Sequence, residues 1–203
     1  MVNPFFSVLV PSHNGMPHIT KLLDSIVNQT YTDYELIVAA DACDDDTAII
    51  AREYGAEVIE LNNHSEGKTR NALLSPASGE WILWADDDDW FLHEYVFDQL
   101  ALMAGQHDED ILFFSFIFKG REHGYTEQTP TRSFFAVWNK CWRRSIVEGC
   151  FCPDVAYGAD VGFTKSVYQK DPKRYYWNMP MYYYNYMRPG SLTWKYKHGE
   201  IIL

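Results

Sequence analysis

The 203-residue sequence predicts an α/β fold in which a mainly parallel sheet is flanked by helices. Short apolar runs alternate with segments whose apolar residues recur at helical spacing. Repeated strand–helix–strand units of this kind produce parallel sheets covered on both faces. Polar clusters follow several of the apolar runs, and ligands of such sheets bind beyond the carboxyl ends of the strands. We therefore expect a ligand site at that edge.

The expected strands in the first part of the chain cover residues 5–10, 35–40, 57–61, 81–85 and 111–118. Pro11 is expected to end the first strand, because proline lacks the N–H group that a sheet ladder uses. Glycines stand close to the ends of several units, with Gly55 a plausible helix stop and Gly79 just before a strand.

The expected helices lie between these strands. The first has apolar residues at helical spacing, namely Ile19, Leu22, Leu23 and Ile26. The carboxylates of residues 44–46 can cap the second and complement its dipole, with Ala48, Ile49 and Ala51 on its apolar side. The others are expected near residues 67–74 and 93–103.

The later part of the chain is less regular. Residues 120–132 are polar and loop-like, residues 136–148 have mixed helical spacing, and a helix is expected to start at Asp160. Aromatic residues make up 16% of the sequence and concentrate in residues 175–186, which predict strands. Their rings can form a core or a surface that stacks on sugars or bases. No linker interrupts the chain, so residues 1–203 are expected to form one domain.

Charge and composition exclude several classes of protein. Lys and Arg total 17 against 28 Asp and Glu, a net charge of −11, which argues against duplex nucleic acid and polybasic membrane surfaces as partners. No apolar run has the length of a membrane span, and no secretory leader is visible, so a cytoplasmic location is expected. The four cysteines lack paired zinc spacing and are expected to be free thiols: Cys43, Cys141, Cys150 and Cys152.

The run of four aspartates at residues 86–89 is the strongest chemical signal. An acidic run by itself is most simply a solvated surface, but this one joins a buried strand directly to Trp90 and Phe91. Crowded carboxylates raise one another's pKa, and a hard divalent cation relieves that repulsion. The spacing of Asp86 and Asp88 is expected to put both carboxylates on one side of an extended segment. Mg²⁺ or Mn²⁺ shared with substrate phosphates fits this pattern.

Further motifs occur in a specific order, at residues 7–14, 22–31, 35–47, 67–71 and 78–90. By these motifs the chain resembles the inverting nucleotide-diphospho-sugar glycosyltransferases of family 2, which have the GT-A fold. Residues 138–140 and 157–160 are similar to acceptor-side elements of that family. The resemblance implies a nucleotide-sugar-binding half at residues 1–118 and an acceptor-side half at residues 119–203.

The resemblance also implies roles for individual residues. Asp160 would be the catalytic base, and Asp88 and Asp86 would hold Mn²⁺ or Mg²⁺, with Asp88 the better candidate for direct coordination. Asp41 would hydrogen-bond the nucleobase, and Arg70 would contact the donor. The full set of donor-binding residues implied is Pro11, Ser12, Asn14, Asp41, Arg70, Asp86 and Asp87.

The implied reaction moves a sugar from a nucleotide-diphosphate donor, with UDP favoured, to a hydroxyl of a glycan, lipid-linked, protein or small-molecule acceptor. Ala40 departs from the family pattern, which leaves the donor base open, and Ala159 stands where a glutamate often precedes the catalytic aspartate. The C-terminal region is short, which implies a shallow acceptor subsite or a partner that completes it. Oligomeric state also stays open. Two alternatives remain: a non-catalytic nucleotide-sugar-binding or glycan-binding domain, and a sugar-nucleotidyltransferase, which would be expected to show a Gly-rich basic loop after the first strand.

Overall fold

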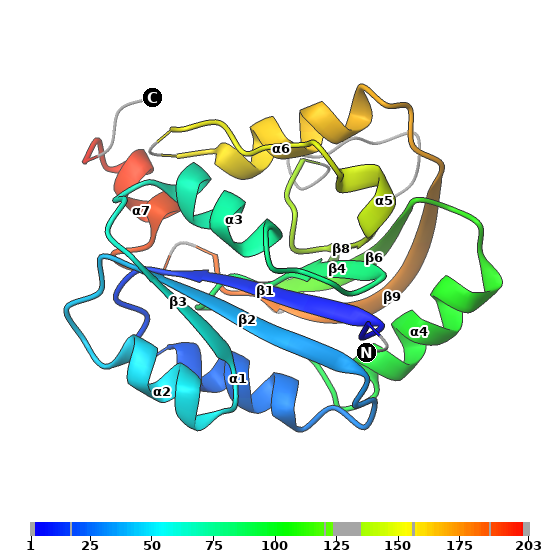
Figure 1. Cartoon of the computed structure of the whole chain (residues 1–203), viewed down its shortest axis with the longest axis horizontal. Helices are drawn as coiled ribbons and strands as arrows, with labels where there is room; N and C mark the ends of the chain where they lie inside the picture. Colours follow the sequence, from blue (N-terminus) through cyan, green and yellow to red (C-terminus); the bar gives the residue numbers. More distant parts are fainter. Residues whose placement is uncertain are drawn as a thin grey trace.

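A computed structural model describes residues 3–16, 18–119, 121–123, 135–155, 157–186 and 188–200 (Figure 1). The strands are β1 (Phe6–Ser12), β2 (Tyr34–Asp41), β3 (Glu57–Leu61), β4 (Trp81–Trp84), β5 (Trp90–Phe91), β6 (Ile111–Phe118), β7 (Arg121–His123), β8 (Lys140–Arg143) and β9 (Arg174–Tyr184). The helices are α1 (Ile19–Val27), α2 (Thr47–Glu53), α3 (Glu66–Leu74), α4 (Val96–Gln106), α5 (Arg144–Val147), α6 (Ala159–Tyr168) and α7 (Leu192–Lys197).

These strands form one mixed sheet in the order β3-β2-β1-β4-β8-β6-β9-β5, with β7 paired to β6. The four strands β3, β2, β1 and β4 are parallel, so their carboxyl ends meet at the left-hand edge in Figure 1. Strand β8 lies antiparallel between β4 and β6, and β6 pairs in parallel with β9. The predicted α/β fold is confirmed, and the parallel edge is the one that carries the polar clusters.

Two helical layers cover the sheet. Helices α1, α2 and α4 lie on one face, and α3, α5 and α6 lie on the other (Figure 1). The short α7 lies beyond the carboxyl edge of the parallel strands. None of the described helices has the length and apolar character needed to cross a membrane.

Pro11 does not end the first strand, contrary to the expectation from the sequence. It stays within β1 and pairs in register with Ala39 of β2. The other neighbour, β4, pairs with β1 only from Phe6 to Leu9. Proline is tolerated at this position because the ladder on that side has already ended.

Helix α2 also differs in detail from the prediction. Ala48 and Ala51 pack inward as expected, whereas the Ile49 side chain is 56% exposed. The N-cap residue is Asp46, whose side chain makes no capping hydrogen bond, whereas Asp45 before it accepts one of 3.0 Å from the Thr47 backbone N–H.

The helical spacing predicted at residues 136–148 is mostly wrong, because part of this segment forms β8 and only Arg144–Val147 is helical. Cys141 and Trp142 of β8 are fully buried between β4 and β6, and it is this pairing with two strands that makes the segment extended. The loop predicted at residues 120–132 falls largely outside the described residues, apart from β7.

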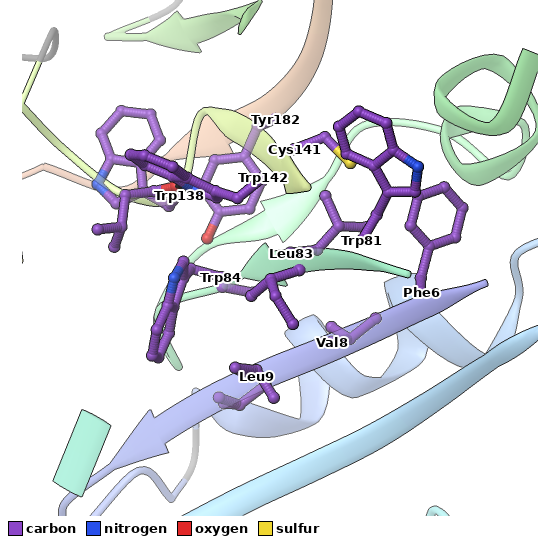
Figure 2. Close-up of a cluster of buried hydrophobic side chains, with 14 of the residues drawn as sticks. Phe6, Val8, Leu9, Trp81, Leu83, Trp84, Trp138, Cys141, Trp142 and Tyr182 are labelled. Atoms are coloured by element: carbon purple, nitrogen blue, oxygen red, sulfur yellow. Dashed lines mark hydrogen bonds between the residues drawn. The ribbon is translucent and has the colours of Figure 1, made fainter. Parts of the chain in front are cut away.

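Aromatic residues dominate the core around β4 and β9 (Figure 2). Trp84 and Tyr182 are fully buried, and the Tyr182 ring stacks on Trp138 at a centroid distance of 5.4 Å. The Tyr182 hydroxyl accepts a hydrogen bond of 3.0 Å from the Asp86 backbone N–H. The core therefore holds the start of the acidic run directly. Of the two roles expected for the late aromatic residues, Tyr182 has the structural one.

Candidate active site

The acidic run follows β4 as a tight turn, in which the Asp89 N–H donates to the Asp86 carbonyl at 3.1 Å. Each of the four carboxylates has a different partner. Asp87 accepts a hydrogen bond from the Ser12 hydroxyl, and Asp89 accepts one of 2.8 Å from the Asn185 N–H. Each of these pairings joins the run to a strand end that is distant in sequence.

Two arginines neutralise the other two carboxylates. Arg70 Nη2 lies 2.9 Å from Asp86 Oδ1, and Arg188 Nε lies 2.8 Å from Asp88 Oδ2. The pKa of Asp87 rises to about 7, because it is buried and lies beside the charged Asp88. Burial likewise raises the pKa of Asp89 well above its usual range. The run thus carries less negative charge at neutral pH than its composition indicates.

Arg70 connects the acidic run to the helices above the sheet. Its side chain is only 6% exposed and pairs through Nε with Glu66 Oε1 at 3.1 Å. Burial opposes its charge, but Asp86 and Glu66 together raise its pKa above the ordinary value, so the guanidinium stays charged. Arg70 Nη1 is buried and has no hydrogen-bond partner within the described part of the chain. That unpaired donor suits a polar ligand at this position.

Glu66 also binds the start of α6 and so connects that helix to the Arg70–Asp86 ion pair. Its Oε2 accepts hydrogen bonds from the backbone N–H groups of Gly158 at 3.0 Å and Ala159 at 3.3 Å. Gly158 is the N-cap residue and has φ +83°, a conformation that glycine adopts without strain. Asp160 lies in the first turn that follows. Glu66 therefore determines where Asp160 is presented.

Asp160 has an environment that opposes its ionisation. Burial and the nearby negative charge of Glu66 raise its pKa to about 7, although Arg70 acts in the opposite direction. Its position in the first turn of α6, where the helix dipole favours a negative charge, does not prevent this increase. A pKa of about 7 is the value that suits a general base working near neutral pH.

The contacts of Glu66 give a testable result. Glu66→Gln should lower the free energy of unfolding by about 1–3 kcal/mol, because buried donors on Arg70 and α6 lose a charged acceptor. Chemical denaturation followed by circular dichroism measures this loss. Glu148→Gln is the matched control, since Glu148 pairs with Arg144 on the surface and should change stability little. Equal effects of the two variants would contradict the assigned role of Glu66.

Asp41 ends β2 and organises the loop that follows β3. Its carboxylate accepts hydrogen bonds from the Asn63 N–H at 2.6 Å, the Ser65 N–H at 3.1 Å and the Thr69 hydroxyl at 2.7 Å. Burial opposes ionisation, but these hydrogen bonds outweigh it and lower the pKa of Asp41. The His64 backbone N–H acts on the Asp41 carboxylate in the same direction.

The loop after β1 packs against both Asp41 and the acidic run. His13 Nδ1 lies 2.7 Å from the Asp41 carbonyl oxygen, and Asn14 Oδ1 accepts a bond of 2.9 Å from the Asp44 N–H. A Cβ atom on Gly15 would lie 2.3 Å from Ser12 Oγ, so only glycine permits this close approach. Pro11, Ser12 and Asn14 thus lie at the edge where the sequence predicted them.

The predicted site residues therefore fall into two groups. Arg70, Asp86 and Asp160 belong to one electrostatic network, in which Glu66 is a member that sequence reasoning missed. Its helical i,i+4 spacing to Arg70 was the available signal. Asp41 belongs to a separate hydrogen-bonded group with Ser65 and Thr69, beside the loop after β1. Arg188 was also missed, and nothing in its sequence neighbourhood marks it.

The acceptor-side residues 138–140 were expected to serve a substrate surface. Trp138 is 5% exposed, and Asn139 and Lys140 are fully buried. Burial lowers the pKa of Lys140 well below its usual range, while the charge of Asp160 acts in the opposite direction. These three side chains therefore belong to the buried core, and Lys140 lies close enough to Asp160 to be affected by its charge.

The donor set at the acidic run suits a hard cation, because it consists of carboxylate oxygens. Within the described ranges, no group of three or more His, Cys, Asp or Glu side chains is placed to hold a metal ion. Asp86 and Asp88 could supply two ligands. Mg²⁺-type sites commonly use one or two carboxylates and complete the shell with substrate phosphates and water. The residues therefore fit a cation that is shared with a diphosphate.

Residues 7–152 match the family model of glycosyl transferase family 2. The chain belongs to this family. The family 2 domain includes Asp41, Arg70 and the acidic run, whereas Asp160 lies beyond the matched residues.

Relatives known by sequence support the assignment. Poly(ribitol-phosphate) beta-N-acetylglucosaminyltransferase TarS of Staphylococcus aureus is 35% identical over 115 residues, which cover 53% of this chain and 20% of TarS. The putative glycosyltransferase EpsH of Bacillus subtilis is 28% identical over 172 residues, covering 73% of this chain and 49% of EpsH. The chain thus spans half or less of the length of these curated relatives.

Solved structures share the GT-A fold. TarS residues 1–349 in complex with UDP-GlcNAc has a TM-score of 0.80 at 24% identity, covering 93% of this chain and 60% of that one. Mannosyltransferase PcManGT from Pyrobaculum calidifontis, in complex with GDP-Man and Mn²⁺, has a TM-score of 0.71 at 17% identity, covering 98% of this chain and 62% of that one.

Proposed function

We propose that this family 2 domain transfers a sugar from a UDP-sugar to a hydroxyl group, with inversion at the anomeric carbon and with the help of a divalent cation. The observation that carries the proposal is the convergence of Asp86, Arg70 and Glu66 with Asp160 at the carboxyl edge of the parallel strands. Residues 1–118 would bind the nucleotide sugar, and residues 119–203 would face the acceptor. The TarS structures with UDP and UDP-GlcNAc favour uridine.

Donor binding would use the residues at the ends of β1, β2 and β4. In this proposal Pro11, Ser12 and Asn14 shape the floor of the pocket, Asp41 accepts from the nucleobase, and Arg70 contacts the donor through its unpaired Nη1. Asp87 would act on the donor side by holding Ser12 in place.

Asp88 and Asp86 would hold the Mn²⁺ or Mg²⁺ ion. When bound, the cation would neutralise the charge that develops on the departing diphosphate. Two solved structures of the same fold contain Mn²⁺ together with a nucleotide. Comparing donor binding in Mn²⁺ with donor binding in Mg²⁺ identifies which of the two ions this chain uses.

Asp160 would act as the base in a single displacement. Its carboxylate would take the proton of the acceptor hydroxyl while that oxygen bonds to the anomeric carbon and the bond to the diphosphate breaks. Attack from the face opposite the leaving group inverts the centre, so one base and no covalent nucleophile are required. Glu66 would hold α6, and with it Asp160, in position.

Thermal unfolding with a panel of nucleotide sugars tests the proposal. A UDP-sugar at 100 times its Kd should stabilise the protein by about 2.7 kcal/mol, and the same ligand should do much less in EDTA than in Mn²⁺. GDP-sugars serve as the matched comparison, because they differ from UDP-sugars in the nucleobase. Failure of every nucleotide sugar to raise the melting temperature would overturn the donor assignment.

The role of Asp41 gives a second binding test. Asp41→Ala should weaken UDP binding by about 1–3 kcal/mol, because the nucleobase loses its buried acceptor. Thr69→Val is the control, since it removes one hydrogen bond to Asp41 and leaves the carboxylate in place. Isothermal titration calorimetry separates the two. Equal losses would mean that Asp41 only organises the loop.

The non-catalytic alternative differs in one measurable result. A nucleotide-sugar-binding domain would bind UDP-sugars without breaking them, whereas the proposed enzyme should release UDP slowly when water replaces the acceptor. The sugar-nucleotidyltransferase alternative requires a nucleoside triphosphate and a sugar phosphate, and coupled release of pyrophosphate would detect it. Neither alternative explains the carboxylate network around Asp160.

A further inference from the structure

Arg188 reaches back to the acidic run from the segment that follows β9. Its Nε lies 2.8 Å from Asp88 Oδ2, although the two residues are 100 positions apart in the sequence. The side chains are 21% and 13% exposed, so the pair is largely shielded from water. This contact joins the late part of the chain to a residue that the proposed function assigns to the cation.

The segment that follows Arg188 includes helix α7, which contains no buried residue. The Tyr196 ring stacks on Tyr157 at a centroid distance of 4.6 Å, just before Gly158 and Asp160. A segment with few buried side chains can open at low free-energy cost.

The two arginines at the acidic run are not equivalent. Arg70 is held between two carboxylates, Asp86 and Glu66, and its side chain is 6% exposed. Among the described residues, Arg188 has, besides Asp88, one weak hydrogen bond, of 3.5 Å, to the carbonyl of the adjacent Pro189. Arg188 is therefore the cation that can leave without breaking a second ion pair.

We propose that Arg188 and the divalent cation are alternative partners of Asp88, so that Arg188 and the segment carrying it must move away before the cation binds. This inference rests on the proposed function, because it takes Asp88 as a cation ligand. A guanidinium at hydrogen-bond distance from Asp88 would face a dication only a few Å away, and like charges at that separation repel strongly. Formation of the Arg188–Asp88 ion pair would therefore weaken the affinity for the cation.

The size of the effect follows from simple competition. If Asp88 is free only in a minor fraction of molecules, the apparent dissociation constant of the cation increases by the inverse of that fraction. Charge-assisted hydrogen bonds are about twice as strong as neutral ones. A closed population of about 90% would weaken Mn²⁺ binding about tenfold.

Mn²⁺ binding without nucleotide tests the proposal, with electron paramagnetic resonance reporting the free ion. Arg188→Gln removes the charge and should bind Mn²⁺ about tenfold more tightly than the wild-type protein. Lys197→Gln is the matched control, because it removes the same charge from the same segment, where Lys197 lies over the Tyr186 ring. It should bind Mn²⁺ as the wild type does.

Two results would overturn the competition. One is an Arg188→Gln variant that binds Mn²⁺ no more tightly than the wild type, or not detectably at millimolar concentrations. The other is an equal gain in Lys197→Gln, which would mean that overall charge is responsible. Should Arg188→Gln fail to fold, Arg188→Lys keeps the charge but loses the planar fork, and should still bind Mn²⁺ more tightly than the wild type.

Asp88→Asn in both backgrounds separates this proposal from the proposed function. If Asp88→Asn loses Mn²⁺ binding and Arg188→Gln shows no gain, Asp88 remains the proposed cation ligand, but the competition with Arg188 is rejected. If the double variant, Asp88→Asn with Arg188→Gln, still binds Mn²⁺ more tightly than the wild type, the cation binds elsewhere. That result would reject both the competition and the assignment of Asp88 to the cation.

Discussion

Asp160→Asn is expected to lower the rate of sugar transfer by about 10²–10⁴-fold, since the acceptor hydroxyl loses its base. The asparagine side chain has the same shape, so α6 and its contact with Glu66 should persist. Donor affinity should change little, because the proposed base faces the acceptor. Steady-state transfer, or UDP release by hydrolysis before an acceptor is known, measures the loss.

The control for Asp160→Asn is UDP binding by calorimetry in the same variant. Full turnover in Asp160→Asn would exclude Asp160 as the base. A simultaneous loss of UDP binding would instead make Asp160 a structural or donor-binding residue. Only lost turnover with retained binding supports the proposed role.

The pH dependence of the reaction should follow the ionisation of Asp160. A base must be unprotonated, and the pKa of Asp160 is about 7, so kcat/KM should fall as the pH decreases below about 7 and level off above it. Asp87 also has a pKa of about 7, and interacting groups titrate together. The pH dependence of kcat/KM in Asp87→Asn therefore distinguishes the two groups. If kcat/KM still falls below about pH 7 in this variant, the decrease is due to Asp160.

The second large effect is expected for Asp88→Asn. This substitution should make UDP binding in Mn²⁺ as weak as wild-type binding in EDTA, with a loss of several kcal/mol of charge stabilisation in the transfer step. Calorimetric titration with UDP in Mn²⁺ and in EDTA measures the binding part. An unchanged difference between the two conditions in Asp88→Asn would remove Asp88 from the cation site.

Asp87→Asn is the matched control for Asp88→Asn and should have a smaller effect on UDP binding. The structure gives a physical reason, because the raised pKa of Asp87 leaves it partly protonated at neutral pH and asparagine resembles the protonated acid. The Ser12 hydroxyl can still donate to the asparagine carbonyl oxygen. A loss as large as that of Asp88→Asn would mean that Asp87 itself binds the cation or the donor.

Local patterns in the sequence were sufficient to predict the edge of the sheet where the site lies. The apolar periodicity of β1, β2, β3 and β4 is a property of consecutive residues, and the polar residues at their ends follow directly from it. Strand β8 was not predicted, because its sequence, Lys-Cys-Trp-Arg, places charged residues at both ends of two apolar ones and shows no strand period. Pro11 was misread because its tolerance depends on where the neighbouring strand ends.

The sequence alone was enough to predict the α/β fold and the family, and it gave Asp41, Arg70, the acidic run and Asp160 as candidate site residues. Only the tertiary structure decided which charge pairs with which. Glu66 meets Gly158 across 92 positions, and Arg188 meets Asp88 across 100. Such pairings depend on the order of strands and on burial, which no local pattern contains. Burial and the nearby charges also raise the pKa of Asp160, because desolvation acts only after distant segments have packed together.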